Sequence, residues 1–342
     1  MARALACMQR QGGVLTRRQA LACGLTGAQV DTLLRRGTWT APARGVYAAS
    51  VSDDVGAVHA VAVAARARLH KDPHAGCCRS AALVLGVPLL GRSPAVPQLV
   101  RAPRGARDTA SQPGIHVAAL AADDVFRCRG VLVTVPARTV VDIARTSSFR
   151  EAVVVADAVL HAGVPRADLE EQLRRCAGWP GAEAAARVVA FADERAESPL
   201  ESLDRVAFAD GGLPAPLTQV DVVGPRGDWL ARCDFVLVRE RTVVEADGLA
   251  KYRMAEGTPV PAWAQDALVK EKQREMGLRA VALEVARNGW AEAFHRPGEL
   301  CERVRQHIWL ASRYPAVPGV RFEQRPVRRR APLTWPLGTA AA

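Results

Sequence analysis

The sequence predicts a multidomain protein with an N-terminal winged helix-turn-helix, a mixed and mostly helical middle domain, and a C-terminal domain of α/β/α layers. At 342 residues the chain is long enough for two or three domains. Two helix-start signals and a short hairpin crowd into residues 1–50, and apolar runs in residues 196–320 alternate between helical and strand patterns. The expected segments are 1–50, 51–195, 196–320 and a flexible basic tail at 321–342.

Charge and composition indicate an anionic partner, with double-stranded DNA as the expected one. The net charge is +11 and the isoelectric point about 9.8. Residues 1–50 alone hold seven Arg and one Asp. The eight cysteines form no C-x-x-C pair, no apolar run has membrane-spanning length, and Met1–Arg10 is too short an apolar run for a secretory signal. We therefore expect a reduced, cytoplasmic protein without a membrane partner. A merely solvated basic surface is the alternative.

The first segment has the element pattern of a small DNA-binding fold. Two T-x-x-Q capping boxes, at Thr16–Gln19 and Thr26–Gln29, open two short helices separated by a tight turn. Two helices joined in this way and followed by a hairpin are typical of a winged helix-turn-helix. The other expected elements are a first helix at Ala2–Gln11 and hairpin strands at Trp39–Ala41 and Gly45–Ala48. A protein-docking module is the alternative.

The helix that opens at Thr26 and ends at Arg36 is the expected recognition helix. Polar side chains on such a helix contact bases and phosphates, and basic residues beside it contact the DNA backbone. Candidate groove and phosphate contacts are Gln29, Thr32, Arg35 and Arg36. Candidate backbone contacts are Arg17, Arg18 and Arg44.

The segment GGVLTRRQALACGLTGAQVDTLLRRGTWTAPARGVYA resembles the N-terminal winged helix of the AbiEi family, the antitoxins of type IV toxin-antitoxin systems. The resemblance is specific in the G-G-V-x-T-R-x-Q-A-L start and the R-R-G-x-W…R-G-V-Y-A end. It implies a transcriptional regulator that binds DNA, often at its own promoter, and a cognate toxin as partner.

The middle segment is rich in Ala and Val and shows no catalytic constellation. We expect helices at Asp54–Leu69 and Arg79–Leu85, strands at Gln98–Arg101 and Val131–Val135, and a run of helices from Pro136 to Asp193. The stretches CCRSAALVLGVPLLG and TVPARTVVDIAR look like the middle domain of the same antitoxin-like proteins.

Four potential metal ligands lie close together in the middle segment: His70, His74, Cys77 and Cys78. Intervening Pro73 and Gly76 interrupt any helix, and the spacing fits no zinc finger. These four residues are therefore not expected to form a zinc site.

The C-terminal segment is organised around a predicted hairpin, Asp234–Val238 followed by Thr242–Asp247. A four-residue loop, Val238–Arg241, sets Leu237 opposite Thr242 and Asp234 opposite Glu245. Opposed Cβ atoms lie about 5 Å apart, and Asp247, two residues further on, points to the same face. Three carboxylates there repel one another unless they share a divalent metal, for which Mg²⁺ or Mn²⁺ is the oxygen-seeking candidate. Acids that cap strand ends and face water are the alternative.

Other elements of this segment complete the order α-β-β-β-α-β-α. Ser198 and Pro199 start a helix to Asp210 and put Glu201 at its third position, where a capping role and an active-site role are both open. The remaining expected elements are a strand at Leu217–Val223, a helix at Ala262–Met276, a strand at Arg279–Val285 and a helix at Pro297–Ser312.

That order, with the motifs CDF, VEADG, AKY and EKQRE, resembles the DUF559 group, which is related to very-short-patch-repair nucleases. The resemblance implies a restriction-endonuclease-like PD-(D/E)XK fold with α/β/α layers, in which Asp234 and Glu245 bind Mg²⁺ and Glu201 supports the site. Asp247 stands where the typical motif has a lysine. Three of the four lysines lie in residues 251–272, so Lys251 or Lys272 is the candidate replacement.

Two functions from different classes follow. The first is a Mg²⁺-dependent DNA endonuclease targeted by its winged helix. The second is an AbiEi-type antitoxin and transcriptional regulator with a non-catalytic nuclease fold. Asp247 in place of lysine favours the regulator, and the carboxylate set favours the nuclease.

Overall fold

The computed structural model describes residues 1–49, 54–105, 108, 112–246 and 262–327, and for residues 262–270 it describes the backbone only. The chain forms two compact units, the first comprising Met1–Ala192 and the second beginning at Asp193. The first unit thus contains both the expected winged helix and the expected middle domain.

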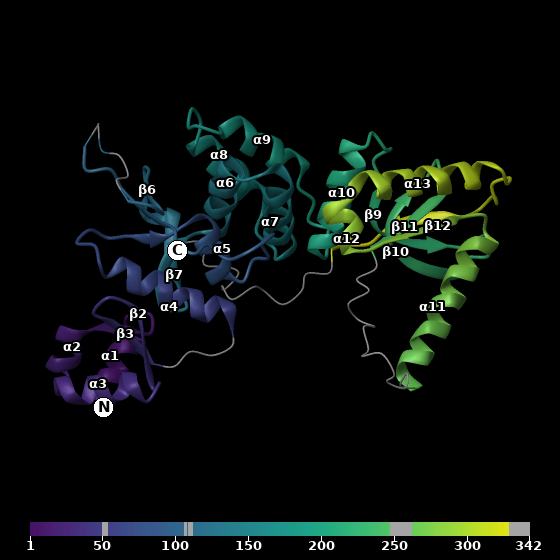
Figure 1. Ribbon diagram of the computed structural model, residues 1–342. Coiled ribbons are helices and arrows are strands. Elements are labelled where there is room, and N and C mark those ends of the chain that lie inside the picture. Colours follow the sequence, from purple (N-terminus) through teal and green to yellow (C-terminus); the bar gives the residue numbers. More distant parts are fainter. Residues whose placement is uncertain (50–53, 106–107, 109–111, 247–261, 328–342) are drawn as a thin grey trace. The chain divides into compact units, whose positions relative to one another are not determined.

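The N-terminal part of the first unit has winged-helix topology (Figure 1, purple). Its three strands pair in the order β1-β3-β2, all antiparallel. Both predicted capping boxes are present, so Thr16 caps α2 and Thr26 caps α3. Strand β1 was not predicted, because three residues carry too little alternation to signal a strand. The elements are α1 (Ala2–Gln9), β1 (Val14–Thr16), α2 (Arg17–Ala22), α3 (Gly27–Arg35), β2 (Trp39–Ala43) and β3 (Val46–Ala49).

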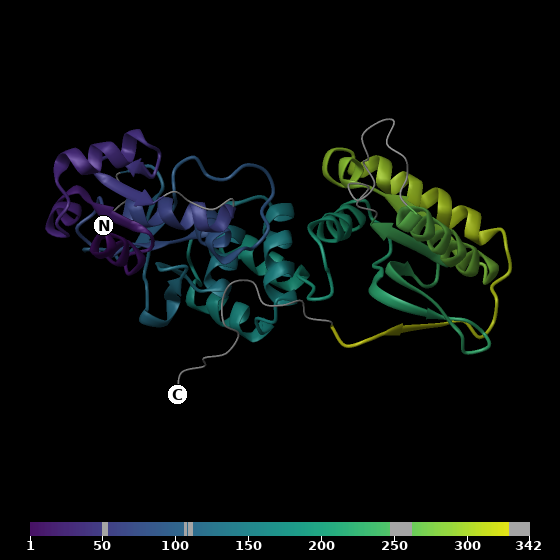
Figure 2. The same cartoon turned by 90° about the horizontal axis from the view of Figure 1, so that it is seen from below.

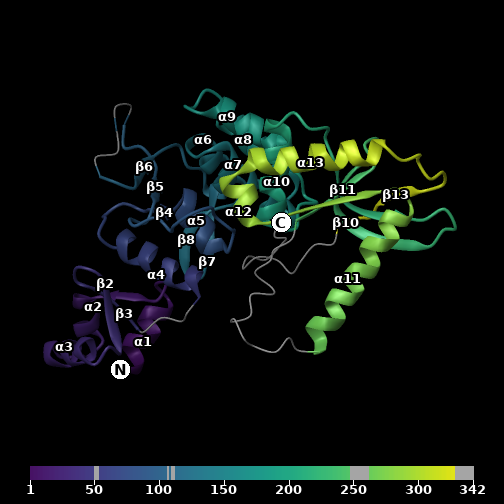
Figure 3. The same cartoon turned by 45° about the vertical axis from the view of Figure 1, so that its right-hand side comes forward.

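The rest of the first unit is a five-stranded sheet with helices. The strand order is β6-β5-β4-β8-β7, and α6 to α9 gather into one cluster (Figures 1 and 3). The elements are α4 (Val55–Ala67), β4 (Ala75–Gly76), α5 (Cys78–Leu85), β5 (Leu99–Arg101), β6 (Ile115–Val117), η1 (Ala122–Asp124), β7 (Val125–Cys128), β8 (Val131–Thr134), α6 (Pro136–Thr146), α7 (Phe149–His161), α8 (Arg166–Arg175) and α9 (Ala182–Phe191).

One glycine contact joins the winged helix to this sheet. Gly12 has φ of +73°, and a Cβ there would lie 2.5 Å from Cγ1 of Val131 at the start of β8. Any larger residue would be strained in its backbone and would clash with Val131. Gly12, which follows α1, is therefore the point of close approach between the two parts.

The second unit has three layers, with a mixed sheet between helices (Figure 1). The strand order is β12-β11-β10-β9-β13, in which only β11 and β12 are parallel. Leu278 of α11 packs on one face of the sheet, and Phe208 of α10 packs edge-on against Phe235 of β10. The elements are α10 (Pro199–Asp210), β9 (Leu217–Val223), β10 (Trp229–Leu237), β11 (Thr242–Ala246), α11 (Ala262–Ala280), β12 (Glu284–Asn288), α12 (Trp290–His295), α13 (Pro297–Ser312) and β13 (Arg321–Gln324).

The hairpin register agrees with the prediction. Leu237 pairs with Thr242 across the loop at 238–241, and Phe235 pairs with Val244. The same register, continued by one position, sets Asp234 across from Glu245. The predicted four-residue loop and strand register are therefore confirmed.

Two expectations need correction. The strand expected at Arg279–Val285 lies later, at Glu284–Asn288, because α11 continues through Gly277 to bury Leu278, and Ala282 then turns the chain at φ +57°. Residues expected in the basic tail form β13, which runs along the sheet edge beside β9 (Figure 2, yellow). Phe322 packs there against the core, which offsets the entropy of ordering the strand. Within the described residues, no helix is long and apolar enough to cross a membrane.

Candidate functional site

Helix α3, the expected recognition helix, presents its basic end to solvent. Arg35 and Arg36 are exposed at its C-terminus, and Arg44 is exposed in the turn between β2 and β3. Thr32 donates its hydroxyl to the Ala28 carbonyl at 2.8 Å and accepts from Nη2 of Arg35 at 3.2 Å. Thr32 therefore positions Arg35 along the helix.

Three other predicted DNA-contact residues lie on the same fold with different local roles. Gln29 is exposed, but its Oε1 accepts the Thr26 backbone N–H at 2.8 Å as part of the capping box. Arg17 donates to Asp31 at 3.2 Å and to the Tyr47 hydroxyl at 3.1 Å, which ties α2 to α3 and β3. Arg18 is exposed on α2. A structural contact thus already engages Arg17 in the protein without DNA.

In the second unit, Glu201 is buried at the start of α10, with 5% of its surface exposed. Its Oε1 accepts from the Ser198 hydroxyl at 2.8 Å, and its Oε2 accepts from the Glu197 N–H at 3.0 Å. The Ser198 hydroxyl also accepts the Glu201 N–H at 3.2 Å. Ser198 therefore caps α10, but the capping box is incomplete, because the Glu201 carboxylate accepts the N–H of Glu197 and not that of Ser198.

Gln219 connects Glu201 to Asp234. Its Nε2 donates to Oε2 of Glu201 at 2.9 Å and to Oδ1 of Asp234 at 3.1 Å. The other oxygen of Asp234 accepts the Ala246 N–H at 2.9 Å, across the hairpin. Gln219 has φ of +54°, in a region that costs a non-glycine residue about 1–3 kcal/mol. The bridge is thus built on a strained strand position.

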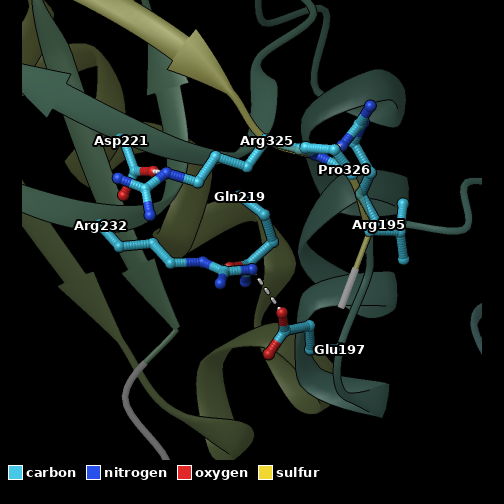
Figure 4. Close-up of a pocket in the computed structure, with 8 residues that line it drawn as sticks. Arg195, Glu197, Gln219, Asp221, Arg232, Arg325 and Pro326 are labelled. Carbon is cyan, nitrogen blue, oxygen red and sulfur yellow. Dashed lines mark hydrogen bonds and ion pairs between the residues drawn. The ribbon is translucent and has the colours of Figure 1, made fainter. Parts of the chain in front are cut away.

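Arg232 and Glu197 extend this network toward solvent. Arg232 donates from Nε to Oε1 of Gln219 at 2.8 Å and pairs through Nη2 with Glu197 at 2.6 Å. Figure 4 shows these three side chains pointing toward one another. Arg325, just after β13, pairs with Asp221 on the same side, so this end of the expected tail contributes to the surface of the site.

The carboxylates of Glu201, Asp234 and Glu245 are buried and repel one another. Burial, and then the charge of Asp234, raise the pKa of Glu201 to about 7. The same two causes raise the pKa of Glu245 to about 7, and burial also raises the pKa of Asp234. Such displaced acids are typical of sites where charge is held for function, although structural clusters show them too.

Glu245 contacts the opposite helix layer. Its Oε2 lies 3.5 Å from Nη2 of Arg274 on α11, and no N–H or O–H group of the described residues donates to its buried Oε1. Asp234, by contrast, connects through Gln219 to α10. The two strand acids lie across from one another in the hairpin and connect to different helices, α10 for Asp234 and α11 for Glu245. Asp247 and Lys251 lie outside the described residues.

The cation beside Glu245 is Arg274, and Lys272 is exposed on the same helix. Residues two apart on a helix point about 200° apart, so they cannot share a face. Glu271 and Glu275 pair with Arg287 of β12, and Leu278 is buried, which identifies the sheet-facing side of α11. The structure therefore brings Arg274, and not Lys272, to the carboxylates.

A second buried acid was not predicted. Asp204, one turn after Glu201 on α10, is fully buried and accepts from Nδ2 of Asn288 at 2.7 Å. Burial is the main cause that raises its pKa. The i, i+3 spacing of Glu201 and Asp204 was a signal in the sequence, but nothing in it pointed to Asn288 as a partner.

Removal of Arg274 tests this arrangement. Arg274→Gln should lower the free energy of unfolding by roughly 1–2 kcal/mol at about pH 8, because Glu245 then keeps a buried charge without its counter-ion. At about pH 5 the loss should shrink, since Glu245 is protonated in both proteins. Denaturant titrations at the two pH values measure this. Lys272→Gln is the matched control and should change stability by less than about 0.5 kcal/mol; equal losses in both variants would contradict the assignment.

Comparison with known proteins identifies the first part of the chain. Residues 3–50 match a family described as "Transcriptional regulator, AbiEi antitoxin". Two uncharacterized proteins of Mycobacterium tuberculosis, MT2308 and Rv2248, are each 32% identical over 185 residues, which cover 53% of this chain and 64% of theirs. The matched region is thus less than two thirds of either relative.

A solved structure is also similar. The crystal structure of the Rv2827c protein from Mycobacterium tuberculosis shares 18% identity with a TM-score of 0.34, over 59% of this chain and 78% of that one. The winged helix at residues 3–50 is thus the part of the chain that is similar to the AbiEi antitoxin and transcriptional regulator family.

Proposed function

We propose that the protein is a DNA-binding transcriptional regulator of the AbiEi antitoxin type. One observation carries the proposal: the residues that match the family are the residues that build the winged helix and its exposed arginines. DNA is the partner that a basic recognition helix and wing fit. A cognate toxin is the protein partner that the antitoxin family implies.

In this proposal α3 enters the major groove, as the second helix of a helix-turn-helix does. Arg35 and Arg36 neutralise phosphates at the groove edge, and Arg44 on the wing contacts the neighbouring backbone. Arg17 holds α2 against α3, so its contribution is partly structural. The overall charge of +11 adds attraction that does not depend on sequence.

Fluorescence anisotropy with the full chain and a labelled duplex tests the proposal. We expect binding that weakens steeply with salt, because neutralised phosphates release counter-ions. Selection from random duplexes should then enrich one motif, since a regulator reads base edges as well as phosphates. Binding that shows no salt dependence, or no enrichment over many rounds, would argue against a regulator.

A second candidate function, metal-dependent DNA cleavage, is favoured by the carboxylate cluster in the second unit. Its acids fit a divalent cation: within the described part of the chain no N–H or O–H group donates to the buried Oε1 of Glu245, and all the candidate ligand atoms are the hard oxygens that Mg²⁺ and Mn²⁺ prefer. Asp234 and Glu245 would hold the ion, which when bound supplies charge stabilisation for phosphodiester hydrolysis.

The chain's own residues have defined tasks in this candidate. Gln219 orients Asp234, and Glu201 holds Gln219 through its amide. Arg274 offers a fixed positive charge beside Glu245, where a lysine was expected from Lys251 or Lys272. Arginine cannot be tuned by burial as lysine can, so Arg274 suits phosphate binding better than proton transfer.

Metal binding should be visible as stabilisation. Mg²⁺ or Mn²⁺ at tenfold excess over its Kd should add about 1.4 kcal/mol to the free energy of unfolding, because it binds the native state. Differential scanning fluorimetry should show a raised Tm for the wild type and none for Asp234→Asn. The control Asp228→Asn, in an exposed turn, should keep the rise. Absence of a rise in the wild type at millimolar metal would remove the metal from this candidate.

Cleavage itself is tested with plasmid and linear DNA in Mg²⁺, in Mn²⁺ and in EDTA. Nicking that requires metal and is lost in Asp234→Asn, but not in Asp228→Asn, would support the nuclease. If the wild type binds DNA and does not cut it under any of these conditions, the nuclease candidate is rejected and the regulator is the one remaining function.

A further inference from the structure

The middle part of the first unit brings together two thiols and an imidazole. Cys77, Cys78 and His116 each offer one ligand atom, and these atoms lie within 4.8 Å of one another. Within the described residues this is the one group of three or more His, Cys, Asp or Glu side chains with that geometry. The two cysteines are buried, and His116 is on β6, forty residues further along the chain.

The backbone that presents the two cysteines is fixed on both sides. The Cys77 N–H donates to the Gln98 carbonyl at 3.1 Å, and the side chain of Gln98 accepts the Arg79 N–H at 2.9 Å. Val100, two residues after Gln98, pairs with His116 in the parallel ladder between β5 and β6. Strand β5 and the residue before it therefore link the cysteines to the histidine. Backbone pairing thus fixes the positions of the three ligand residues before any metal binds.

Cys78 has an unusual conformation. Its φ is +49°, which is rare and strained for a residue with a side chain. Cys77, directly before it, is fully extended at φ −138° and ψ 176°. Successive residues normally point to opposite sides of an extended chain, and the left-handed turn at Cys78 is what allows both sulfurs to lie near one imidazole.

His116 adds an independent sign of a missing partner. Its Nε2 is buried and has no hydrogen-bond partner among the described groups. A buried polar atom left without a partner destabilises the fold, and a bound ligand would remove that cost. The nearby acid Asp142 is already paired with Arg138 at 3.0 Å and Arg145 at 3.4 Å, so it is committed elsewhere.

We propose that Cys77, Cys78 and His116 form a binding site for a thiophilic divalent metal ion of the Zn²⁺ class. Two sulfur ligands and one imidazole are a donor set that Zn²⁺ favours over Mg²⁺. Binding replaces the two thiol protons with two metal–sulfur bonds and releases both protons to solvent. Three protein ligands would leave one coordination position for a further ligand, and the three residues line a hollow together with Arg145 and Thr146.

This site differs from the zinc site that the sequence argued against. His70 and His74, the histidines nearest to the cysteines in sequence, contact each other with tilted rings at a centroid distance of 4.5 Å and are not in the cluster. The third ligand instead comes from His116, on another strand. Sequence spacing could not show it, because β5 lies between the ligands.

Cobalt binding to the full chain tests the proposal. After chelator treatment and reduction, Co²⁺ should give the near-ultraviolet thiolate-to-cobalt charge-transfer band, and Zn²⁺ should displace it. Cys77→Ser and Cys78→Ser should each lose the band, and His116→Gln should weaken it. Cys128→Ser, at another buried cysteine of the same unit, should keep it. Far-ultraviolet circular dichroism reports whether each variant is folded.

A measurement on the wild type alone covers the case in which a variant does not fold. Zn²⁺ should slow alkylation of the peptide that holds Cys77 and Cys78, as read by mass spectrometry, and should leave Cys128 unchanged. Mg²⁺ should not protect either peptide. The proposal fails if the wild type gives no thiolate band in excess Co²⁺ or if the band persists in folded Cys77→Ser. It also fails if Zn²⁺ slows alkylation of the peptide with Cys77 and Cys78 no more than alkylation of the peptide with Cys128.

Discussion

Replacing Arg35 and Arg36 together with alanine is expected to weaken DNA binding by the full chain on the order of 100-fold at low salt. Both side chains are exposed at the end of α3. A lost charge-assisted phosphate contact costs about 1.5–3 kcal/mol, and 1.4 kcal/mol is about tenfold in affinity. Each lost contact should also reduce the slope of log affinity against log salt by about 1.

Anisotropy titrations over a range of salt concentrations measure both effects. The matched control is Arg174→Ala with Arg175→Ala, an adjacent arginine pair at the end of α8. This control lowers the net charge by the same amount but lies outside the winged helix. If the control variant loses as much DNA affinity and salt dependence as the α3 variant, only the total charge of the protein matters. If the salt dependence of the α3 variant is unchanged, Arg35 and Arg36 do not contact phosphates.

Local signals are the reason why the winged helix was predictable. Each T-x-x-Q capping box satisfies two backbone N–H groups with side chains three residues apart, so the start of a helix is encoded within four residues. Both boxes are present, at Thr16 and Thr26. Strand β1 was missed because it depends on pairing with β3, about thirty residues later.

The hairpin of the second unit was predictable for a similar reason. A loop length fixes the register of the strands that it joins, and Leu237 pairs with Thr242 as expected. The partners of its acids were not predictable. Gln219 and Arg274 come from other elements, and the Asp204–Asn288 contact spans 84 residues. Such contacts depend on how the helix and sheet layers pack together, and a local sequence pattern does not predict that packing.

The same limit applies to the ends of elements. Helix α11 extends beyond Gly277 because Leu278 gains burial against the sheet, and tertiary burial outweighs the preference of glycine for a helix end. Strand β13 exists because β9 offers an edge to pair with. A run of mostly charged residues at 321–325 resembles a tail until that edge is known.

The buried Glu201 makes stability depend on pH in a direction opposite to that of a salt-bridged acid. Burial and the charge of Asp234 raise its pKa from 4.5 to about 7 in the folded protein. The folded state therefore binds more protons than the unfolded state between these values, so the free energy of unfolding falls as the pH rises. One pKa unit corresponds to about 1.36 kcal/mol, and the full displacement to roughly 3 kcal/mol. This contribution is complete below about pH 4.5 and is lost as the pH passes 7.

Glu201→Gln should remove most of that pH dependence, because glutamine resembles the protonated acid. Its amide can donate to the Ser198 hydroxyl, now 2.8 Å from Oε1, while its oxygen accepts from Glu197 N–H and Gln219. We therefore expect the variant to match the wild type at about pH 5 and to exceed it by up to about 3 kcal/mol at about pH 8, in metal-free denaturant titrations. Glu302→Gln, on the exposed face of α13, is the control and should change neither value. If the variant is equally destabilised at both pH values, Glu201 serves only as a helix cap. If the variant is more stable than the wild type at about pH 8 and added Mg²⁺ abolishes that difference, the repulsion between Glu201 and Asp234 is what favours cation binding.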